Sequence, residues 1–242
     1  MIIEEASSLF MSKTLGILAG LGPLAGAHFY RRVIELTPAQ DDAEHLSVVL
    51  ISDRSIPSRL AHLSGTGLSP ISALQGVAQR LVSAGAEVLA IPSTTTHAYY
   101  QDIATCVSVP VLNLIALVTD EIVRQGCHRV GIVATSPTRE YGLYDKAFAA
   151  YGIEAVYPDA VTQREIMTII HGVKASGNHR SWGLRLIKVM QDRWVEQADS
   201  LVLACTETPV VFAADSSVPP VLERPLLDAT DLLARAAIAA CH

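Results

Sequence analysis

The sequence predicts an α/β protein of two similar lobes, each a doubly wound parallel sheet, related by a pseudo-two-fold axis with the active site in the cleft between them. Short apolar runs alternate with amphipathic stretches, which is typical of parallel strands joined by crossover helices. Of the 242 residues, 50% are hydrophobic, so the chain can bury a sizeable core. The order of the segments also repeats once, which indicates two halves built alike.

In the first half, apolar runs predict strands and amphipathic stretches predict helices. Thr14–Ala19 is short and apolar and ends at a glycine, as buried parallel strands do. Pro23 suits the first turn of a helix, and Gly126 marks the end of a later one. We expect strands at Thr14–Ala19, His45–Ser52, Val88–Ile91 and Pro110–Leu114, and helices from Pro23 onward, at Leu74–Ala84 and at Thr119–Gln125.

The pattern restarts in the second half. Arg129–Ala134 predicts a strand, followed by a loop at Thr135–Thr138. A further strand is expected at Ser200–Ala204, and a short segment beginning at Leu226–Leu227 leads into the last helix. We expect the helices of this half at Tyr144–Tyr151, Ile166–Val173, Trp182–Gln197 and Thr230–Ala240.

The restart is an internal repeat with an offset of about 112 residues. Three pairs of segments match in one order, and two such halves facing each other would place equivalent strand ends on opposite sides of one cleft. Ligands of open α/β sheets bind beyond those carboxyl ends. The matched pairs are Ala86–Thr94 (AEVLAIPST) with Ala198–Thr206 (ADSLVLACT), Thr14–Ala19 (TLGILA) with Arg129–Ala134 (RVGIVA), and Pro110–Asn113 (PVLN) with Pro225–Asp228 (PLLD).

Charge and cysteine content argue against several function classes. Lysine and arginine total 18 against 24 acidic residues, a net charge of −6 without a basic stripe, so no nucleic-acid partner is expected. No apolar run reaches membrane length, and the first residues lack the features of a signal peptide. The four cysteines form no CxxC pair and no metal-ligand spacing. We therefore expect a reduced, cytoplasmic protein without a metal site or a membrane partner.

Candidate reactive side chains follow two strands that the repeat makes equivalent. Ser93-Thr94-Thr95 ends one strand, and Cys205-Thr206-Glu207 ends the other. Inversion of a carbon centre needs one group to remove a proton from one face and another to return a proton to the opposite face. Taken singly, such a serine is usually a helix cap and such a cysteine is usually inert packing. Their pairing by the repeat favours an acid/base role for Ser93 and Cys205.

Several segments occur in one order between about Thr14 and the C-terminus: Gly20-Leu21-Gly22-Pro23, Ile56-Pro57-Ser58-Arg59, Pro92-Ser93-Thr94-Thr95-Thr96-His97, Tyr151-Gly152-Ile153-Glu154, Gln163, Ile170-His171-Gly172-Val173-Lys174 and Ala204-Cys205-Thr206-Glu207-Thr208-Pro209. They resemble the motifs of the aspartate/glutamate racemase family. The resemblance implies an isomerase that acts on a small amino acid without pyridoxal phosphate, any other cofactor or metal, with two cysteines as acid and base, and it allows a homodimer.

The resemblance also implies lobe boundaries and substrate contacts. The last strand and helix of each half are expected to pack on the other lobe, which gives lobes at 11–112 plus 226–242 and at 113–225, with 1–10 as a flexible extension. Arg59 and Lys174 match the positions that hold the distal carboxylate of a dicarboxylic substrate, and the fork of an arginine suits that role. Alternatively, Arg59 and Lys174 are solvated surface cations without a role in substrate binding.

The residues next to the two reactive positions complete the expected site. Thr95 and Thr206, with nearby backbone amides, would hold the α-carboxylate of the substrate, and Thr94 is expected among the substrate-binding residues. Glu207 would orient or polarise the neighbouring thiol side of the site. His97 stays outside the catalytic set, because a lone histidine after a helix start is more often a cap or a supporting residue. Cys106, Cys127 and Cys241 have no partner in the repeat and are expected to be structural.

The sequence departs from the family pattern at two places. Leu21 stands where the family usually has Met, and Ser93-Thr94-Thr95 stands where it usually has Cys-Asn-Thr. One of the two thiols is therefore missing, and the Ser93 position is either a natural hydroxyl variant or an inactivating substitution. Two other functions stay open: a related decarboxylase or isomerase that uses Cys205 alone, and a non-catalytic amino-acid-binding protein.

A dinucleotide-binding pattern competes with this interpretation. Gly20-Leu21-Gly22-Pro23-Leu24-Ala25 fits a GxGxxA fingerprint after a strand, and Asp53 ends the next strand, where a ribose-binding acid would lie. Proline in the phosphate loop removes one N–H donor, and the second half brings no second fingerprint. Glycine turns after strands are common without any cofactor, so we favour the racemase interpretation.

Overall fold

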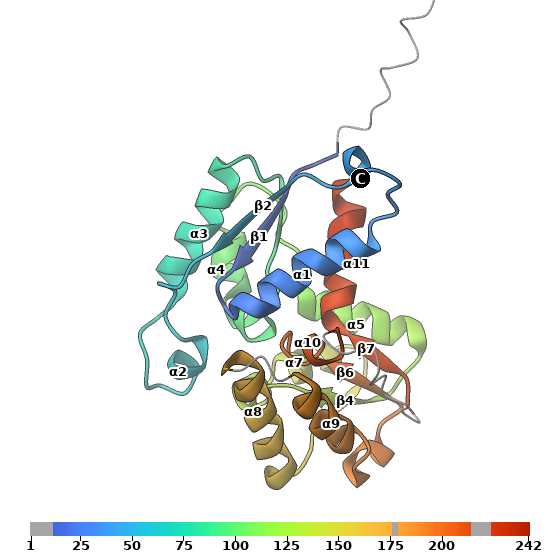
Figure 1. Cartoon of the computed structure of the whole chain (residues 1–242). Helices are drawn as coiled ribbons and strands as arrows, with labels where there is room; N and C mark the ends of the chain where they lie inside the picture. Colours follow the sequence, from blue (N-terminus) through green and yellow to red (C-terminus); the bar gives the residue numbers. More distant parts are fainter. Residues whose placement is uncertain (1–11, 176–178, 214–223) are drawn as a thin grey trace, which may run out of the picture.

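The computed structural model describes residues 12–175, 179–213 and 224–242, so the predicted extension at 1–10 lies outside the described residues. Two parallel sheets form two lobes, one above the other in Figure 1. Within the described ranges, no helix combines the length and the apolar character needed to cross a membrane. The helices are α1 (Pro23–Leu36), α2 (Arg59–Leu63), α3 (Ile71–Ser83), α4 (Tyr100–Ala104), α5 (Leu114–Gln125), α6 (Ser136–Glu140), α7 (Leu143–Ala149), α8 (Ala160–Ala175), α9 (His179–Met190), α10 (Val210–Ala213) and α11 (Ala229–Cys241), with 3-10 turns η1 (Asp42–Glu44), η2 (Thr94–Tyr99) and η3 (Arg193–Gln197).

The first sheet has the order β2-β1-β3, formed by β1 (Leu15–Ala19), β2 (Val48–Ser52) and β3 (Val88–Ala90). All residues of β1 are buried, because side chains alternate between the two faces of a strand and helices cover both. Leu15 and Ile17 pack into the core that α1 and α11 share. Leu18 faces the other way, toward α3.

The strand predicted at Pro110–Leu114 is wrong for most of its length. Only Val111 bridges to the first sheet, opposite Leu89. The side chain of Asn113 accepts a hydrogen bond from the backbone N–H of Ala116 at 3.1 Å and so caps α5. The helix therefore begins at Leu114 and includes Thr119–Gln125, the segment predicted to be helical.

The second sheet has the order β5-β4-β6-β7, formed by β4 (Arg129–Val133), β5 (Glu154–Val156), β6 (Ser200–Leu203) and β7 (Leu226–Asp228). Helices α8 and α9 pack against one face of this sheet. The opposite face packs against α5 and α7. The hydrophobic contribution of such burial is about 25 cal/mol per Å² of apolar surface removed from water.

Two further sequence predictions fail in this lobe. Thr135–Thr138 is not a plain loop, because the Thr135 side chain accepts from the backbone N–H of Thr138 and caps the short helix α6. The helix predicted at Trp182–Gln197 is two elements, with α9 ending at Met190 and η3 following. The carboxylate of Asp192 accepts from the backbone N–H of Arg193 at 2.7 Å, and this capping contact starts the new turn.

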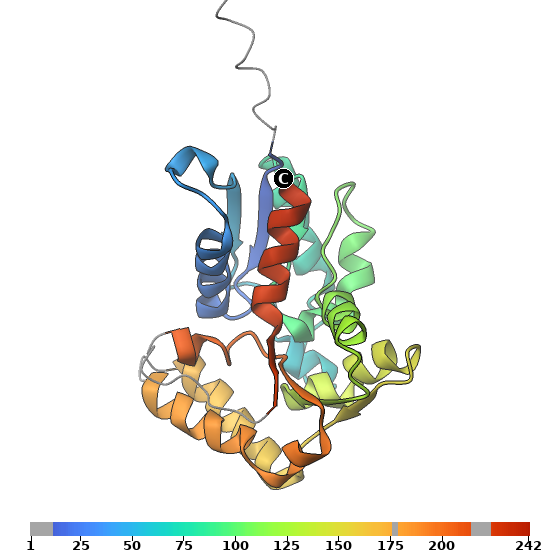
Figure 2. The same ribbon diagram turned by 90° about the vertical axis from the view of Figure 1, so that its right-hand side faces the viewer.

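The last helix of the chain crosses from one lobe to the other, as Figure 2 shows. Strand β7 pairs with β6 in the second sheet, whereas α11 packs against α1 and the first sheet. Residues 226–228 were expected in the first lobe and instead extend the second sheet, since their backbone groups pair with β6. The rest of the proposed lobe division stays a prediction.

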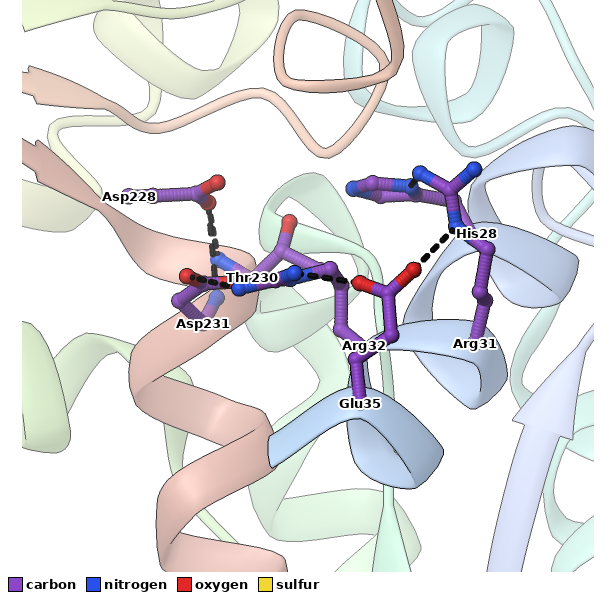
Figure 3. Close-up of polar contacts among 7 residues, drawn as sticks. All are labelled: His28, Arg31, Arg32, Glu35, Asp228, Thr230 and Asp231. Carbon is purple, nitrogen blue, oxygen red and sulfur yellow. Dashed lines mark hydrogen bonds and ion pairs between the residues drawn. The ribbon is translucent and has the colours of Figure 1, made fainter. Parts of the chain in front are cut away.

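Polar contacts fasten α11 to α1 (Figure 3). Arg32 donates two hydrogen bonds to the carboxylate of Asp231, at 2.6 and 2.8 Å, and it also pairs with Glu35. The Asp228 carboxylate accepts from the backbone N–H of Thr230 at 2.7 Å, so it caps α11 as Asn113 caps α5. The helix that leaves the second sheet is thus anchored on the first lobe, which connects the two lobes next to the strand ends.

Candidate active site

The two strand ends that the repeat makes equivalent meet at the junction of the lobes. The hydroxyl of Thr94 donates a hydrogen bond to the carbonyl of Ala204. The hydroxyl of Thr206 donates to the carbonyl of Pro92 at 3.2 Å. The turn that carries Ser93 therefore touches the turn that carries Cys205, as the pseudo-symmetry predicts.

Cys205 lies in a short chain of polar contacts. Its thiol donates to Oε2 of Glu207 at 3.1 Å, and Oε1 of Glu207 lies 3.2 Å from Nζ of Lys174. Cys205 and Glu207 are both buried. Burial, followed by the nearby Glu207 carboxylate, raises the pKa of the Cys205 thiol well above its ordinary value, while Lys174 lowers it. The resting group is thus a thiol whose hydrogen-bond acceptor is a carboxylate.

The Glu207 carboxylate lies at the start of helix α1. A Cβ atom on Gly22 would approach Oε1 of Glu207 to 2.2 Å, so a larger residue at this position would displace the carboxylate from its observed place. A negative charge is favourable at a helix N-terminus. A cavity of about 220 Å³ opens beside it, lined by Gly20, Leu21, Gly22, Pro23, Leu24, Val173, Lys174 and Glu207.

Arg59 is the first residue of α2, and its side chain extends toward the loop before α1 that lines the cavity. Its guanidinium donates to the carbonyl of Leu21, a residue that lines the cavity. Its Nε atom is buried and makes no hydrogen bond in the described structure. Burial lowers the pKa of Arg59, and the Glu207 carboxylate counteracts this. An incompletely paired, partly buried cation is costly and well suited to an anionic ligand.

The hydroxyl of Ser93 is partly buried and accepts a hydrogen bond from the Thr96 hydroxyl at 2.8 Å. His97 lies behind it. Its Nε2 accepts from the backbone N–H of Leu114 at 3.0 Å, so Nδ1 carries the proton and donates to the carbonyl of Ser93 at 2.9 Å. Burial lowers the pKa of His97, which keeps it neutral. The histidine thus fastens the Ser93 turn to the start of α5.

Thr95 lies in a buried cluster of hydroxyls contributed by both lobes. Its hydroxyl lies 3.1 Å from that of Thr135 and 3.0 Å from that of Thr138, and the last two are 2.9 Å apart. The structure thus brings Ser93, Thr94, Thr95, Cys205, Thr206, Glu207 and Lys174 to the lobe junction. Of the predicted site residues, Lys174 and Glu207 are the ones that line the cavity.

Packing accounts for both glycines of the GxG pattern. Gly20 has a φ of +84°, and a Cβ atom there would lie 2.4 Å from the backbone nitrogen of Asp53, while Gly22 makes room for Glu207. The Asp53 carboxylate accepts from the backbone and hydroxyl of Ser55, at 2.8 and 2.6 Å, and pairs with Arg80. The Asp53 side chain is therefore held by its own lobe.

The remaining cysteines lie away from the contacts of Cys205. Cys127 follows α5 and Cys106 follows α4, both partly buried, and Cys241 is buried at the end of α11. Burial raises the pKa of Cys241 to about 11. In the described part of the chain, no three acidic, histidine or cysteine side chains gather in a way that could hold a metal ion.

Sequence reasoning missed the part that Gly22 plays in holding Glu207, and it missed the hydroxyl cluster of Thr135 and Thr138. The proline after Gly22 signalled a helix start, but not which carboxylate would lie there. The TSPT segment at Thr135–Thr138 carried a capping signal that could have identified α6. No signal in the sequence indicated its contact with Thr95.

Comparisons with known proteins find similar sequences and similar folds. A family model described as Asp/Glu/Hydantoin racemase matches residues 18–237. RacX of Bacillus subtilis, a broad specificity amino-acid racemase, is 26% identical over 238 residues, which span 93% of this chain and 96% of the relative. Picrophilus torridus aspartate racemase matches with a TM-score of 0.83 and 28% identity, over 95% of this chain and 94% of that one. A glutamate racemase from Francisella tularensis, in complex with D-glutamate, shares the fold with a TM-score of 0.61 and 16% identity, over 94% and 80%.

Proposed function

Because the chain belongs to the Asp/Glu/hydantoin racemase family, and is thus an isomerase, we propose that it interconverts the enantiomers of an acidic amino acid, aspartate or glutamate. Cys205 exchanges the α-proton on one face and the Ser93 side acts on the other, without a cofactor. The observation that carries the proposal is the buried Cys205 thiol hydrogen-bonded to Glu207, whose carboxylate lines a cavity together with Lys174.

The Cys205–Glu207 contact supplies a route to a reactive base. Transfer of the thiol proton to Glu207 gives a thiolate and a carboxylic acid, and a thiolate is the reactive form of cysteine. The thiolate then removes the α-proton of the amino acid and becomes a thiol again, leaving a carbanion. In the opposite direction the thiol donates its proton to the carbanion. General acid/base catalysis of this kind contributes about 10²–10⁴-fold to a rate.

On the opposite face of the carbanion, the Ser93 hydroxyl is the group that exchanges the proton. The Ser93 hydroxyl accepts from Thr96, so its own proton remains available for donation. Because Ser93 is only partly buried, water can reach it and replace the donated proton. A hydroxyl is a much weaker base than a thiolate, so we expect this face to donate protons more readily than it removes them.

Charge balance supports an acidic substrate. In the resting protein Lys174 pairs with Glu207. When Glu207 takes the thiol proton it becomes neutral, and Lys174 is then released to pair with a distal carboxylate. The incompletely paired guanidinium of Arg59 supplies the second cation. A dicarboxylic substrate would therefore assist the proton transfer that activates Cys205.

The Arg59→Ala and Lys174→Ala variants are each expected to weaken aspartate binding by about 1.5–3 kcal/mol, the value of one charge-assisted hydrogen bond. Calorimetric titration of each variant with aspartate measures this. Arg124→Ala is the matched control, because its guanidinium pairs with Glu121 on the outer surface of α5 and is 72% exposed. Unchanged affinity in both site variants would rule out their role in substrate selection.

The function itself is tested by a steady-state assay with the L- and D-forms of aspartate and glutamate at high enzyme concentration. Racemisation of either amino acid, detected by chiral chromatography from both starting enantiomers, is the expected result. Neutral amino acids form the comparison set. Loss of the carboxyl group as CO₂ would instead favour a decarboxylase. Thermal stabilisation by an amino acid without turnover would favour a binding protein.

A further inference from the structure

We propose that Thr94 and Thr206 are positioning residues, whose hydroxyls form a latch between the lobes that sets the separation of Cys205 and Ser93. The term latch denotes the two hydrogen bonds from Thr94 to Ala204 and from Thr206 to Pro92. This inference rests on the proposed racemisation. It replaces the expectations from sequence that Thr206 holds the α-carboxylate of the substrate and that Thr94 is a substrate-binding residue.

The two bonds of the latch are images of each other. The repeat offset of about 112 residues carries Pro92 onto Ala204 and Thr94 onto Thr206. In each bond, the residue after one acid/base position donates to the carbonyl of the residue before the other. Two equivalent hydrogen bonds, related by the pseudo-two-fold symmetry, therefore link the turn of Ser93 directly to the turn of Cys205.

The hydroxyls of the latch are committed to these bonds. A threonine hydroxyl has a single proton, and each of the two gives that proton to a carbonyl of the other lobe. Thr94 and Thr206 are both 3% exposed. Tyr144 of α7, fully buried, lies beside Thr94, which limits replacement of this bond by solvent. Binding of a substrate carboxylate by either hydroxyl would require breaking the latch.

The accepting carbonyls explain why the latch controls catalysis. Pro92 and Ala204 immediately precede Ser93 and Cys205, so each bond holds the backbone to which a reactive side chain is attached. Two groups that serve opposite faces of one carbon must keep a fixed separation. A misplacement of about 1 Å can lower a rate by about 100-fold. Loss of the latch should therefore affect the chemical step more than substrate binding.

The test uses Thr94→Val and Thr206→Val, which keep the shape of the side chain and remove the hydroxyl. Each is expected to lower kcat for aspartate about 10–100-fold, with KM within about twofold of the native value. Thr94→Ser and Thr206→Ser keep a hydroxyl and should restore most of kcat. The double valine variant should cost little more than a single one, because residues that act as a unit are not additive.

Thr119→Val is the matched control. Thr119 is also buried and its hydroxyl also donates to a carbonyl, that of Ile115 at 2.8 Å, but this bond lies within α5. The control is expected to leave kcat and KM unchanged. Circular dichroism and melting temperature verify that every variant is folded. Should a valine variant fail to fold, its serine counterpart and alanine variants provide the comparison.

A second readout does not depend on turnover. The rate at which iodoacetamide alkylates Cys205, followed by mass spectrometry of its peptide, should rise at least about fivefold in both valine variants and return in the serine variants, since opening of the junction exposes a buried thiol. Raised KM with unchanged kcat, or unchanged kcat and alkylation, would overturn the latch. A native protein without racemase activity would refute the proposed function, and the alkylation rates would still decide on the latch.

Discussion

Replacing Cys205 by alanine is expected to lower racemisation of aspartate and glutamate by about 10²–10⁴-fold, the range that a general acid/base contributes. The thiol donates its hydrogen bond to the buried carboxylate of Glu207, and its removal eliminates both the base and the acid of one face. Alanine also leaves Glu207 paired with Lys174, so the fold should be retained. Chiral chromatography from each enantiomer measures the loss.

Cys127→Ala is the control for this experiment. Cys127 is partly buried and packs at the edge of the core, so its substitution should leave the rate within about twofold of the native value and alter stability only modestly. Circular dichroism establishes that both variants are folded. A Cys205→Ala protein that keeps its native rate would end the proposal that this thiol does the chemistry.

Most of the fold follows from the sequence because its signals are local. In the apolar runs Thr14–Ala19 and Arg129–Ala134, all residues but the first are buried in the structure. Predicting these strands needed no knowledge of their neighbours. The failure at Pro110–Leu114 has a tertiary cause. That segment is apolar enough for a strand, but only Val111 pairs with the sheet. Asn113 caps α5, and Leu114 is the first residue of that helix.

The expected site was predictable only in part, for a physical reason. The internal repeat identified Ser93 and Cys205 as counterparts, because strand ends follow from the order of the elements. The partners of the Thr94 and Thr206 hydroxyls depend instead on how the two lobes pack, which no local pattern records. The same limit applies to Gly22, since its contact with Glu207 joins residues from opposite ends of the chain.

The missing thiol at Ser93 has a measurable consequence in D₂O. A cysteine ionises near pKa 8.5 in its ordinary state, whereas a serine hydroxyl is far harder to ionise. In the described part of the chain, the Ser93 hydroxyl contacts the Thr96 hydroxyl, and the imidazole of His97 binds the Ser93 carbonyl, so no base acts on this hydroxyl. Cys205 should therefore remove the α-proton and often return deuterium to the same face.

Deuterium is thus expected to enter one enantiomer of aspartate faster than that enantiomer inverts, and by analogy with the family's second cysteine we expect this to be the L-form. The equilibrium between enantiomers is fixed at unity, so only exchange relative to inversion can differ. Proton NMR with L- and D-aspartate measures both rates. Equal exchange of the two enantiomers would defeat the one-thiol mechanism.

Ser93→Cys tests the same face from the opposite direction. It introduces a thiol where the family usually has one, on the turn that the Thr94–Ala204 and Thr206–Pro92 hydrogen bonds join to the turn of Cys205. Inversion is expected to rise about 10–100-fold, within the range of a gained acid/base group, and exchange into the two enantiomers should become more nearly equal. Ser93→Ala is the control and should lower inversion while exchange by Cys205 persists. If the introduced thiol leaves inversion unchanged in a folded protein, position 93 is not the second acid/base site, because a thiolate there would have had the strength that the hydroxyl lacks.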